Sequence, residues 1–161
     1  MAETAVFNAS PLIFFSRGGH LELLRAVVGG VLVPEPVAAE IRRRGPRDPT
    51  SAALTSELWL QVVPAPAPSE AILQWGLGPG ESAVLALCER NPRRVAVIDD
   101  LAGRKCASSL GIPVRGTLGI VLVAKRRGLV PAARPVLEDL LRAGMYLSRR
   151  VLDEALTRVG E

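Results

Sequence analysis

The sequence predicts an α/β fold, a three-layer α/β/α domain with a central, mainly parallel sheet of about five strands. Short apolar runs alternate with longer segments in which apolar residues recur at helical spacing, and this alternation is typical of a sheet covered by helices. The runs are apolar throughout, as in strands that are buried on both faces of a parallel sheet. With 161 residues, 48% of them hydrophobic, the chain is long enough for one such domain over residues 1–161.

Each apolar run is expected to form one strand, and the third is expected to lie nearest an edge. The five strands cover residues 4–8, 31–34, 58–63, 94–98 and 112–116. Residues 64–80 are rich in proline and glycine and are expected to form a surface loop.

Helix-start residues stand at the beginning of several of the other segments. Ser10 precedes Pro11, Asp48 precedes Pro49, and Ser148 opens the last segment, as N-caps do. The expected helices cover residues 10–18, 21–28, 35–45, 48–57, 81–91, 99–111, 117–128, 131–144 and 148–160.

Several function classes are excluded by what the sequence lacks. No basic region precedes the first apolar stretch, and no apolar run approaches the roughly 18 residues that cross a bilayer, so we expect a cytoplasmic protein without a membrane segment. His20 is the only histidine, which excludes a zinc pattern, and it is expected at a helix start or on the surface. Cys88 and Cys106 are expected to be buried free thiols. The glycines at 78 and 80 lack the lysine of a phosphate-binding loop.

Positive charge is concentrated in the second half of the chain. The formal net charge is +4, and residues 101–137 contain no carboxylate. Such a region attracts polyanions, although solvated helix faces are the alternative interpretation of each single residue. The residues that we expect to bind RNA are Arg104, Lys105, Lys125, Arg126 and Arg127.

Polar side chains follow two of the predicted strands. Asp99 and Asp100 come directly after the strand at 94–98, and Asn8 ends the first strand. In parallel sheets, sites form in the crevice beyond the carboxyl ends of the strands. Helix capping is the alternative, but one N-cap explains one aspartate and not both.

Two glutamates are further candidates. Glu40 borders the apolar stripe of its helix, with an ion pair to Arg44 as the alternative explanation. Glu81 opens a helix, where an acid also complements the helix dipole. Acids on one rim without histidine or cysteine favour a hard cation, Mg²⁺ or Mn²⁺, which activates water and stabilises charge on a phosphodiester.

Five segments in order resemble PIN-domain proteins, in particular a prokaryotic branch that is related to VapC-type toxins. The resemblance covers residues 6–155. The segments are "NASPLI", "VLVPEPVAAEI", "GPGESAVLAL", "VIDDLAGRKCASSLGIPV" and "GTLGIVLVAKRRGLV". It implies a five-stranded parallel sheet and a Mg²⁺- or Mn²⁺-dependent endoribonuclease that acts on single-stranded RNA.

The resemblance also assigns roles to individual residues. Glu40, Glu81 and Asp100 match the acids of the family, with Asp99 as a second ligand beside Asp100. Asn8 stands where the family has its first aspartate; it would ligate the metal without bringing charge, which weakens metal binding and puts activity in doubt. Two hydroxyl residues match positions near the site, with helix capping as their alternative role. They are Ser10 and Thr117.

Partners are also implied by the resemblance. A toxin of this kind pairs with an antitoxin protein, and a homodimer is expected. The helices at residues 10–17 and 35–44 are the expected partner surfaces, on the assumption that apolar residues near them are exposed. The alternative function is a catalytically weak PIN scaffold that binds RNA or a protein partner, and Asn8 motivates it.

Overall fold

Five parallel strands form one sheet in the order β3-β2-β1-β4-β5, in a computed structural model that describes residues 3–161. The strands are β1 (Thr4–Phe7), β2 (Gly30–Pro34), β3 (Leu60–Val63), β4 (Arg94–Val97) and β5 (Val114–Arg115). All four pairings are parallel, and β3 lies at an edge. The predicted number of strands and their parallel direction are therefore confirmed.

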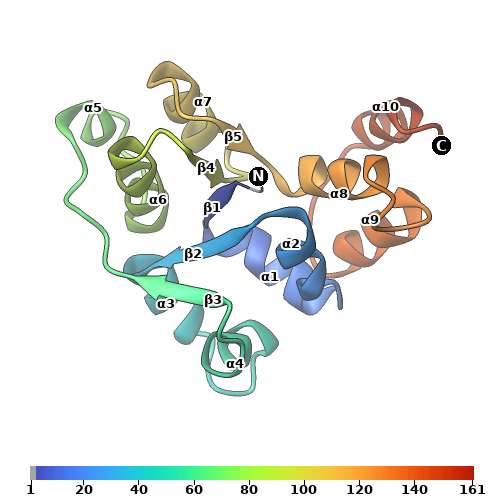
Figure 1. Cartoon of the computed structure of the whole chain (residues 1–161), viewed down its shortest axis with the longest axis horizontal. Helices are drawn as coiled ribbons and strands as arrows, with labels where there is room; N and C mark the ends of the chain where they lie inside the picture. Colours follow the sequence, from blue (N-terminus) through green and yellow to red (C-terminus); the bar gives the residue numbers. More distant parts are fainter. Residues whose placement is uncertain (1–2) are drawn as a thin grey trace.

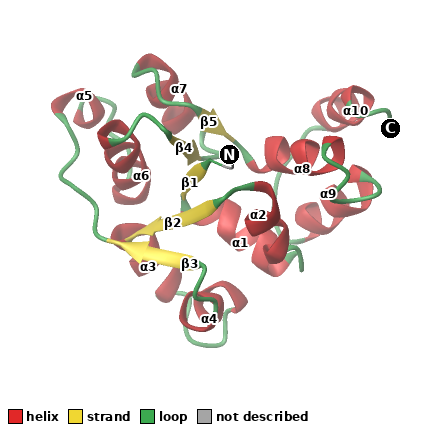
Figure 2. Cartoon of the chain, viewed as in Figure 1, coloured by secondary structure: helices red, strands yellow, loops and turns green. Residues whose placement is uncertain are grey.

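Helices cover both faces of the sheet, which confirms the three-layer α/β/α prediction (Figures 1 and 2). The crossovers from β1 to β3 run in one direction along the sheet, and the chain then returns to β4 and β5 on the other side of β1. Since such crossovers are nearly always right-handed, the helices of the two halves are expected on opposite faces. The helices are α1 (Ala9–Arg17), α2 (Leu21–Val27), α3 (Glu35–Arg42), α4 (Pro49–Ser56), α5 (Glu70–Leu73), α6 (Pro79–Arg90), α7 (Leu101–Ser109), α8 (Thr117–Arg126), α9 (Ala133–Arg142) and α10 (Arg149–Arg158).

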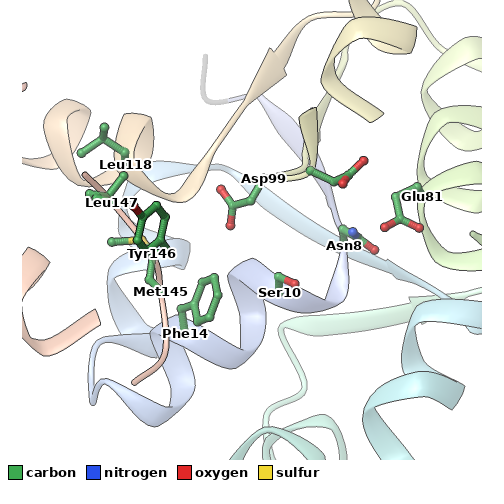
Figure 3. Close-up of a pocket in the computed structure, with 10 residues that line it drawn as sticks. Asn8, Ser10, Phe14, Glu81, Asp99, Leu118, Met145, Tyr146 and Leu147 are labelled. Atoms are coloured by element: carbon green, nitrogen blue, oxygen red, sulfur yellow. The ribbon is translucent and has the colours of Figure 1, made fainter. Parts of the chain in front are cut away.

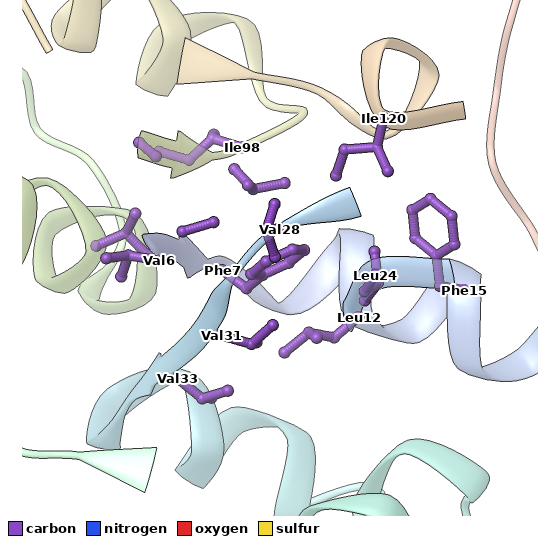
Figure 4. Close-up of a cluster of buried hydrophobic side chains, with 14 of the residues drawn as sticks. Val6, Phe7, Leu12, Phe15, Leu24, Val28, Val31, Val33, Ile98 and Ile120 are labelled. Atoms are coloured by element: carbon purple, nitrogen blue, oxygen red, sulfur yellow. The ribbon is translucent and has the colours of Figure 1, made fainter. Parts of the chain in front are cut away.

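The buried core includes residues of α6 and α7, and several of its largest side chains gather on the α1 side of the sheet. Phe7 of β1, Phe15 of α1 and Ile120 of α8 are fully buried there, with β-branched residues of β2 around them (Figure 4). Both faces of β1 and β4 are buried, which explains why these runs are apolar throughout. The burial fixes the two central strands and hence the positions at which they end.

Two local predictions were wrong. The predicted loop at 64–80 contains α5, because Ser69 Oγ accepts a hydrogen bond from Ile72 N at 3.4 Å and the Ile72 side chain is fully buried. Ser10 is not an N-cap: α1 follows β1 so closely that Asn8 takes the N-cap position and Ser10 lies exposed in the first turn.

The single histidine and the two cysteines have structural positions. His20 is the N-cap residue of α2, as predicted, and its Nε2 lies 2.7 Å from Asp139 Oδ2 of α9. This hydrogen bond, with a second one from Arg142, keeps the pKa of Asp139 below its usual range. Cys88 and Cys106 are buried and free, and burial raises the pKa of Cys88 to about 12.

Over residues 3–161, every helix is too short or too polar to cross a bilayer.

Asp48 caps α4, and its removal is expected to destabilise the fold in a pH-dependent way. Its carboxylate accepts hydrogen bonds from Thr50 N at 3.0 Å, Ser51 N at 3.3 Å and Arg44 Nε at 2.9 Å. Desolvation alone would raise the pKa of Asp48, but these hydrogen bonds outweigh it, so the pKa is lowered. The stabilisation is thus complete above the unfolded-state pKa and is lost as the pH falls through the lower folded-state value.

We expect Asp48→Ala to lower the free energy of unfolding by about 1 kcal/mol at pH 7. Urea denaturation at pH 7 and at about pH 3 measures the difference between the variant and the wild type. A difference that persists undiminished in acid would contradict the capping role.

Candidate functional site at the carboxyl edge of the sheet

The pairing of β1 with β4 brings Asn8 and the two aspartates to one edge of the sheet. Phe7 pairs with Val97, and Asn8 N donates to Val97 O at 3.0 Å. The chain leaves β1 toward β2 on one side, and β4 leads to β5 on the other, so this edge is the switch point of the sheet. Open α/β sheets bind their ligands at such a point.

The adjacent aspartates anchor two different helices. Asp100 is the N-cap of α7, and its Oδ2 accepts from Gly103 N at 2.9 Å. Asp99 reaches the start of α8: its Oδ1 accepts from Thr117 N at 2.7 Å, and its Oδ2 accepts from Thr117 Oγ1 at 2.6 Å. Since Gly116 offers no side chain as N-cap, Asp99 takes over the capping function for α8. Both carboxylates therefore have structural partners.

Asn8 and Glu40 meet at Gly80. A β carbon added to Gly80 would lie 3.0 Å from Asn8 Oδ1 and 3.3 Å from Glu40 Oε2. Asn8 is 5% exposed, and its Oδ1 has no hydrogen-bond partner within residues 3–161. A buried oxygen without a partner costs about 1–3 kcal/mol, so this atom is suited to a ligand.

Glu81 lies on the other side of this group. Its Oε2 would be 2.8 Å from a β carbon on Gly78, so the carboxylate folds back over the start of α6. A β carbon on Gly103 would lie 3.6 Å from Glu81 Cγ and 3.7 Å from Asp100 Oδ2, so both acids lie close to Gly103. Glycines at these positions let backbone and carboxylates approach closely.

The acids do not surround a single point, although the sequence predicts that they share a metal ion. Within residues 3–161, no three acidic, histidine or cysteine side chains are grouped closely enough to hold one metal ion. Asp99 and Asp100 turn toward the helices that they cap, and Glu81 turns toward Gly78. The predicted ligands lie along one rim, and a shared cation would require side-chain rotation.

These side chains form one half of a pocket of about 440 Å³. Its polar half contains Asn8, Ser10, Glu81, Asp99 and Asp100. Figure 3 shows Asn8 facing Glu81, and Asp99 above Ser10, with apolar side chains gathered at the opposite end. Glu40 lines an adjoining depression, which it shares with Glu81.

The apolar half of the pocket was not anticipated from the sequence. It comes from α1, α8 and the segment between α9 and α10, and consists of Phe14, Leu118, Met145, Tyr146 and Leu147. These residues are far apart in the chain and carry no motif. Only the long-range packing of α1 against α9 brings them together.

The basic residues separate into two groups. Lys125 Nζ donates to Pro131 O, and Arg127 Nη1 donates to Val27 O, both at 2.7 Å. These side chains lie at the far end of α8, about 13 Å along the helix from Thr117, and they tie α8 to neighbouring segments. Arg126 and Lys105 are exposed.

Arg104 lies beside the pocket, in a second cleft of about 380 Å³ that shares Asp99 and Leu118 with it. Arg115 and Arg158 line the same cleft. Arg104 Nη1 donates to Ile98 O at 3.2 Å, which holds its guanidinium over Gly116. Arg115 forms an ion pair with Glu3 at 2.6 Å. The positive charge nearest the acids thus comes from β5, α7 and α10.

The family model of DUF3368, a PIN domain, matches residues 4–161 of the chain. The protein belongs to this PIN-domain family. PIN domains are generally nucleases and commonly use divalent metals. No curated protein matches the sequence.

The residues of this PIN domain fit a divalent cation in their chemistry. Carboxylate and amide oxygens are the ligands that Mg²⁺ and Mn²⁺ accept. Asn8 Oδ1 is buried and without a partner, and it lies against Gly80, where the missing side chain leaves space beside Glu40. Glu81 and Asp100 face the same pocket.

The contact between Asp99 and Thr117 predicts a structural penalty for Thr117→Val. Thr117 is fully buried, and valine would leave Asp99 Oδ2 without its hydroxyl donor. We expect the free energy of unfolding to fall by about 1–3 kcal/mol in chemical denaturation. Thr157→Val is the control, because the Thr157 hydroxyl donates to Asp153 O on the exposed surface of α10. Equal losses in both variants would contradict the anchoring role of Asp99.

Proposed function

We propose that this PIN domain is a metal-dependent endoribonuclease that cleaves single-stranded RNA. The observation that carries the proposal is the buried, unpartnered Asn8 Oδ1 at an acid-lined pocket on the switch point of the sheet. Family membership supports nuclease chemistry, since PIN domains are generally nucleases.

We propose that Asn8, Glu40, Glu81 and Asp100 hold the cation, Mg²⁺ or Mn²⁺. A divalent cation supplies stabilisation of the charge that develops on the phosphodiester. Asp99 has a positioning role in this proposal: its contacts with Thr117 fix the start of α8, and the preceding strand fixes Asp100 beside Glu81. Ser10 lies exposed on the pocket wall, where its hydroxyl is available to a bound phosphate.

The cleft of Arg104, Arg115 and Arg158 supports RNA as the substrate. It opens directly beside the acidic half of the pocket and shares Asp99 with it. Arginine guanidinium groups bind phosphate with bidentate geometry, and a polyanion that follows this cleft would bring a phosphodiester to the acids. Arg126 and Lys105 are more distant and contribute long-range attraction in this proposal.

We also propose that the protein is the toxin of a toxin–antitoxin pair and forms a homodimer. We propose a partner surface away from α1 and α3, because among residues 3–161 the large exposed apolar side chains lie outside these two helices. Leu73 and Trp75 are exposed at α5, which packs on α6, and Leu58 is exposed just before β3, at the open edge of the sheet. This edge is the surface that we propose for a protein partner.

A second function is favoured by the same Asn8. An amide brings no charge, and a site with one carboxylate fewer binds a cation less tightly. The alternative is a PIN scaffold with little catalysis, which binds RNA or a protein partner. Binding of RNA in EDTA without cleavage in Mn²⁺ or Mg²⁺ would favour this alternative.

Cleavage of labelled single-stranded RNA tests the nuclease proposal. We expect cleavage in Mn²⁺ or Mg²⁺, none in EDTA, and a loss of at least about 100-fold in Asp100→Asn and Glu81→Gln, as removal of one charge-stabilising group produces. Asparagine retains an oxygen that can cap α7, so folding is preserved. Glu22→Gln is the control, because it removes one carboxylate at an exposed position of α2, outside the pocket. Undiminished metal-dependent cleavage in both site variants would place the chemistry elsewhere.

Asn8→Asp tests whether position 8 contacts the cation. A buried carboxylate beside Glu40 is unfavourable without a metal and favourable with one. We expect a lower melting temperature in EDTA than for the wild type, a larger rise on addition of Mn²⁺, and faster cleavage. Asn91→Asp makes the same charge change at the end of α6 and serves as the control. An equal Mn²⁺ response in Asn8→Asp and the wild type would exclude position 8 as a ligand.

A further inference from the structure

Tyr146 stands out among the aromatic side chains of the described chain. It is the only tyrosine in the sequence, and its side chain is 87% exposed, whereas Phe7 and Phe15 are fully buried. It lies at the apolar end of the pocket, opposite the acids (Figure 3). An exposed aromatic ring that lines a pocket beside polar side chains is typical of a binding site rather than of a solvated surface.

The backbone on either side of Tyr146 is anchored. Gly144 has a φ of +114°, a conformation that favours glycine, and it turns the chain at the end of α9 against Phe14. Met145 is buried and its N–H donates to Leu140 O at 3.1 Å, while Leu147 packs on the core. Tyr146 is therefore an exposed ring on a fixed segment.

The helix that carries this segment is itself held in place. The His20–Asp139 contact joins the start of α2 to α9. Gly18 lies against α9 so closely that a β carbon there would be 2.8 Å from Leu140 Cδ2. These contacts anchor α9, and with it the segment of Tyr146, against α1 and α2, so a ligand would span both halves of the pocket.

We propose that the apolar half of the pocket binds one unpaired nucleobase of the RNA, which stacks on Tyr146. The base would rest against the apolar wall of Phe14 and Leu118, while its neighbouring phosphate lies at the polar half. Aromatic side chains bind bases by stacking, and this requires a base whose face is free. This inference rests on the proposed function, because it takes RNA as the ligand. It adds Tyr146 as the residue that selects single-stranded RNA.

The surroundings favour a base over a protein side chain. Leu118 and Asp99 line both the pocket and the arginine cleft, so a chain that binds the arginines through its phosphates passes Leu118 on its way to the acids. Positive charge on one side and an aromatic ring on the other is the combination found in single-strand binding grooves. A protein segment would have to offer acidic residues to Arg104 and Arg158, since Arg115 is already paired with Glu3.

Abasic scanning of a short single-stranded RNA in EDTA tests the proposal. For the wild type, we expect one abasic position to weaken binding by about tenfold, equivalent to about 1.4 kcal/mol, and the other positions to have smaller effects. Tyr146→Leu keeps apolar bulk but removes the ring, so we expect it to weaken the intact RNA and to abolish the difference among positions. Tyr146→Phe is expected to retain the wild-type pattern. Leu129→Ala, at a 43% exposed apolar position outside the pocket and outside the proposed partner surface, is the control.

The outcomes separate this inference from the nuclease proposal, because binding in EDTA does not depend on cleavage. A pattern that depends on Tyr146, in a protein that cleaves no RNA, supports the base site and contradicts the nuclease. If the wild type cleaves RNA and Tyr146→Leu responds to the abasic positions as the wild type does, the base site is overturned and the nuclease proposal stands. The base site is also overturned if the wild type binds no single-stranded RNA, or if Tyr146→Leu changes only the oligomeric state in mass photometry.

Discussion

The parallel pairing of β1 with β4 sets the position of every polar group in the pocket. Phe7 lies opposite Val97, so the two strands end together, and the residues that follow them enter the same crevice. A slip of one residue would exchange the two buried faces of the strand and take Phe7 away from Phe15 and Ile120, because side chains alternate along a strand. The close packing of side chains of different size on the two faces opposes this slip. The packing of the core therefore determines where the polar residues of the site lie.

Much of the fold was predictable from local patterns, and its exceptions have local causes. Buried runs and capping residues act over a few positions, which is why the strands and most helices were predicted near their observed positions. Helix α5 was missed because it is only four residues long and lies in a segment, residues 64–80, that is rich in proline and glycine; the burial of Ile72 favours its formation. Ser10 was misassigned because the helix starts straight after β1, so that Asn8 precedes it.

The sequence predicted several of the residues that line the pocket, but it did not predict how they are arranged. The acids follow strand ends, and strand ends are visible in the sequence. The partner of Asp99 was not predictable, since Thr117 is 18 positions away and only the β4–β5 pairing brings them together. Charge showed that a basic region exists but not that carbonyl oxygens engage Lys125 and Arg127. Tyr146 carries no periodic signal, because a single residue between two helices has no pattern.

The two aspartates have a mechanical consequence. Asp99 and Asp100 are one peptide unit apart, about 3.8 Å between α carbons, yet one holds the start of α8 and the other the start of α7. Neither helix can tilt without moving the shared peptide, and through it the end of the buried β4. The floor of the pocket therefore behaves as a rigid joint rather than a hinge. The backbone of this segment is already ordered in the folded protein, so ligand binding costs little additional backbone conformational entropy there.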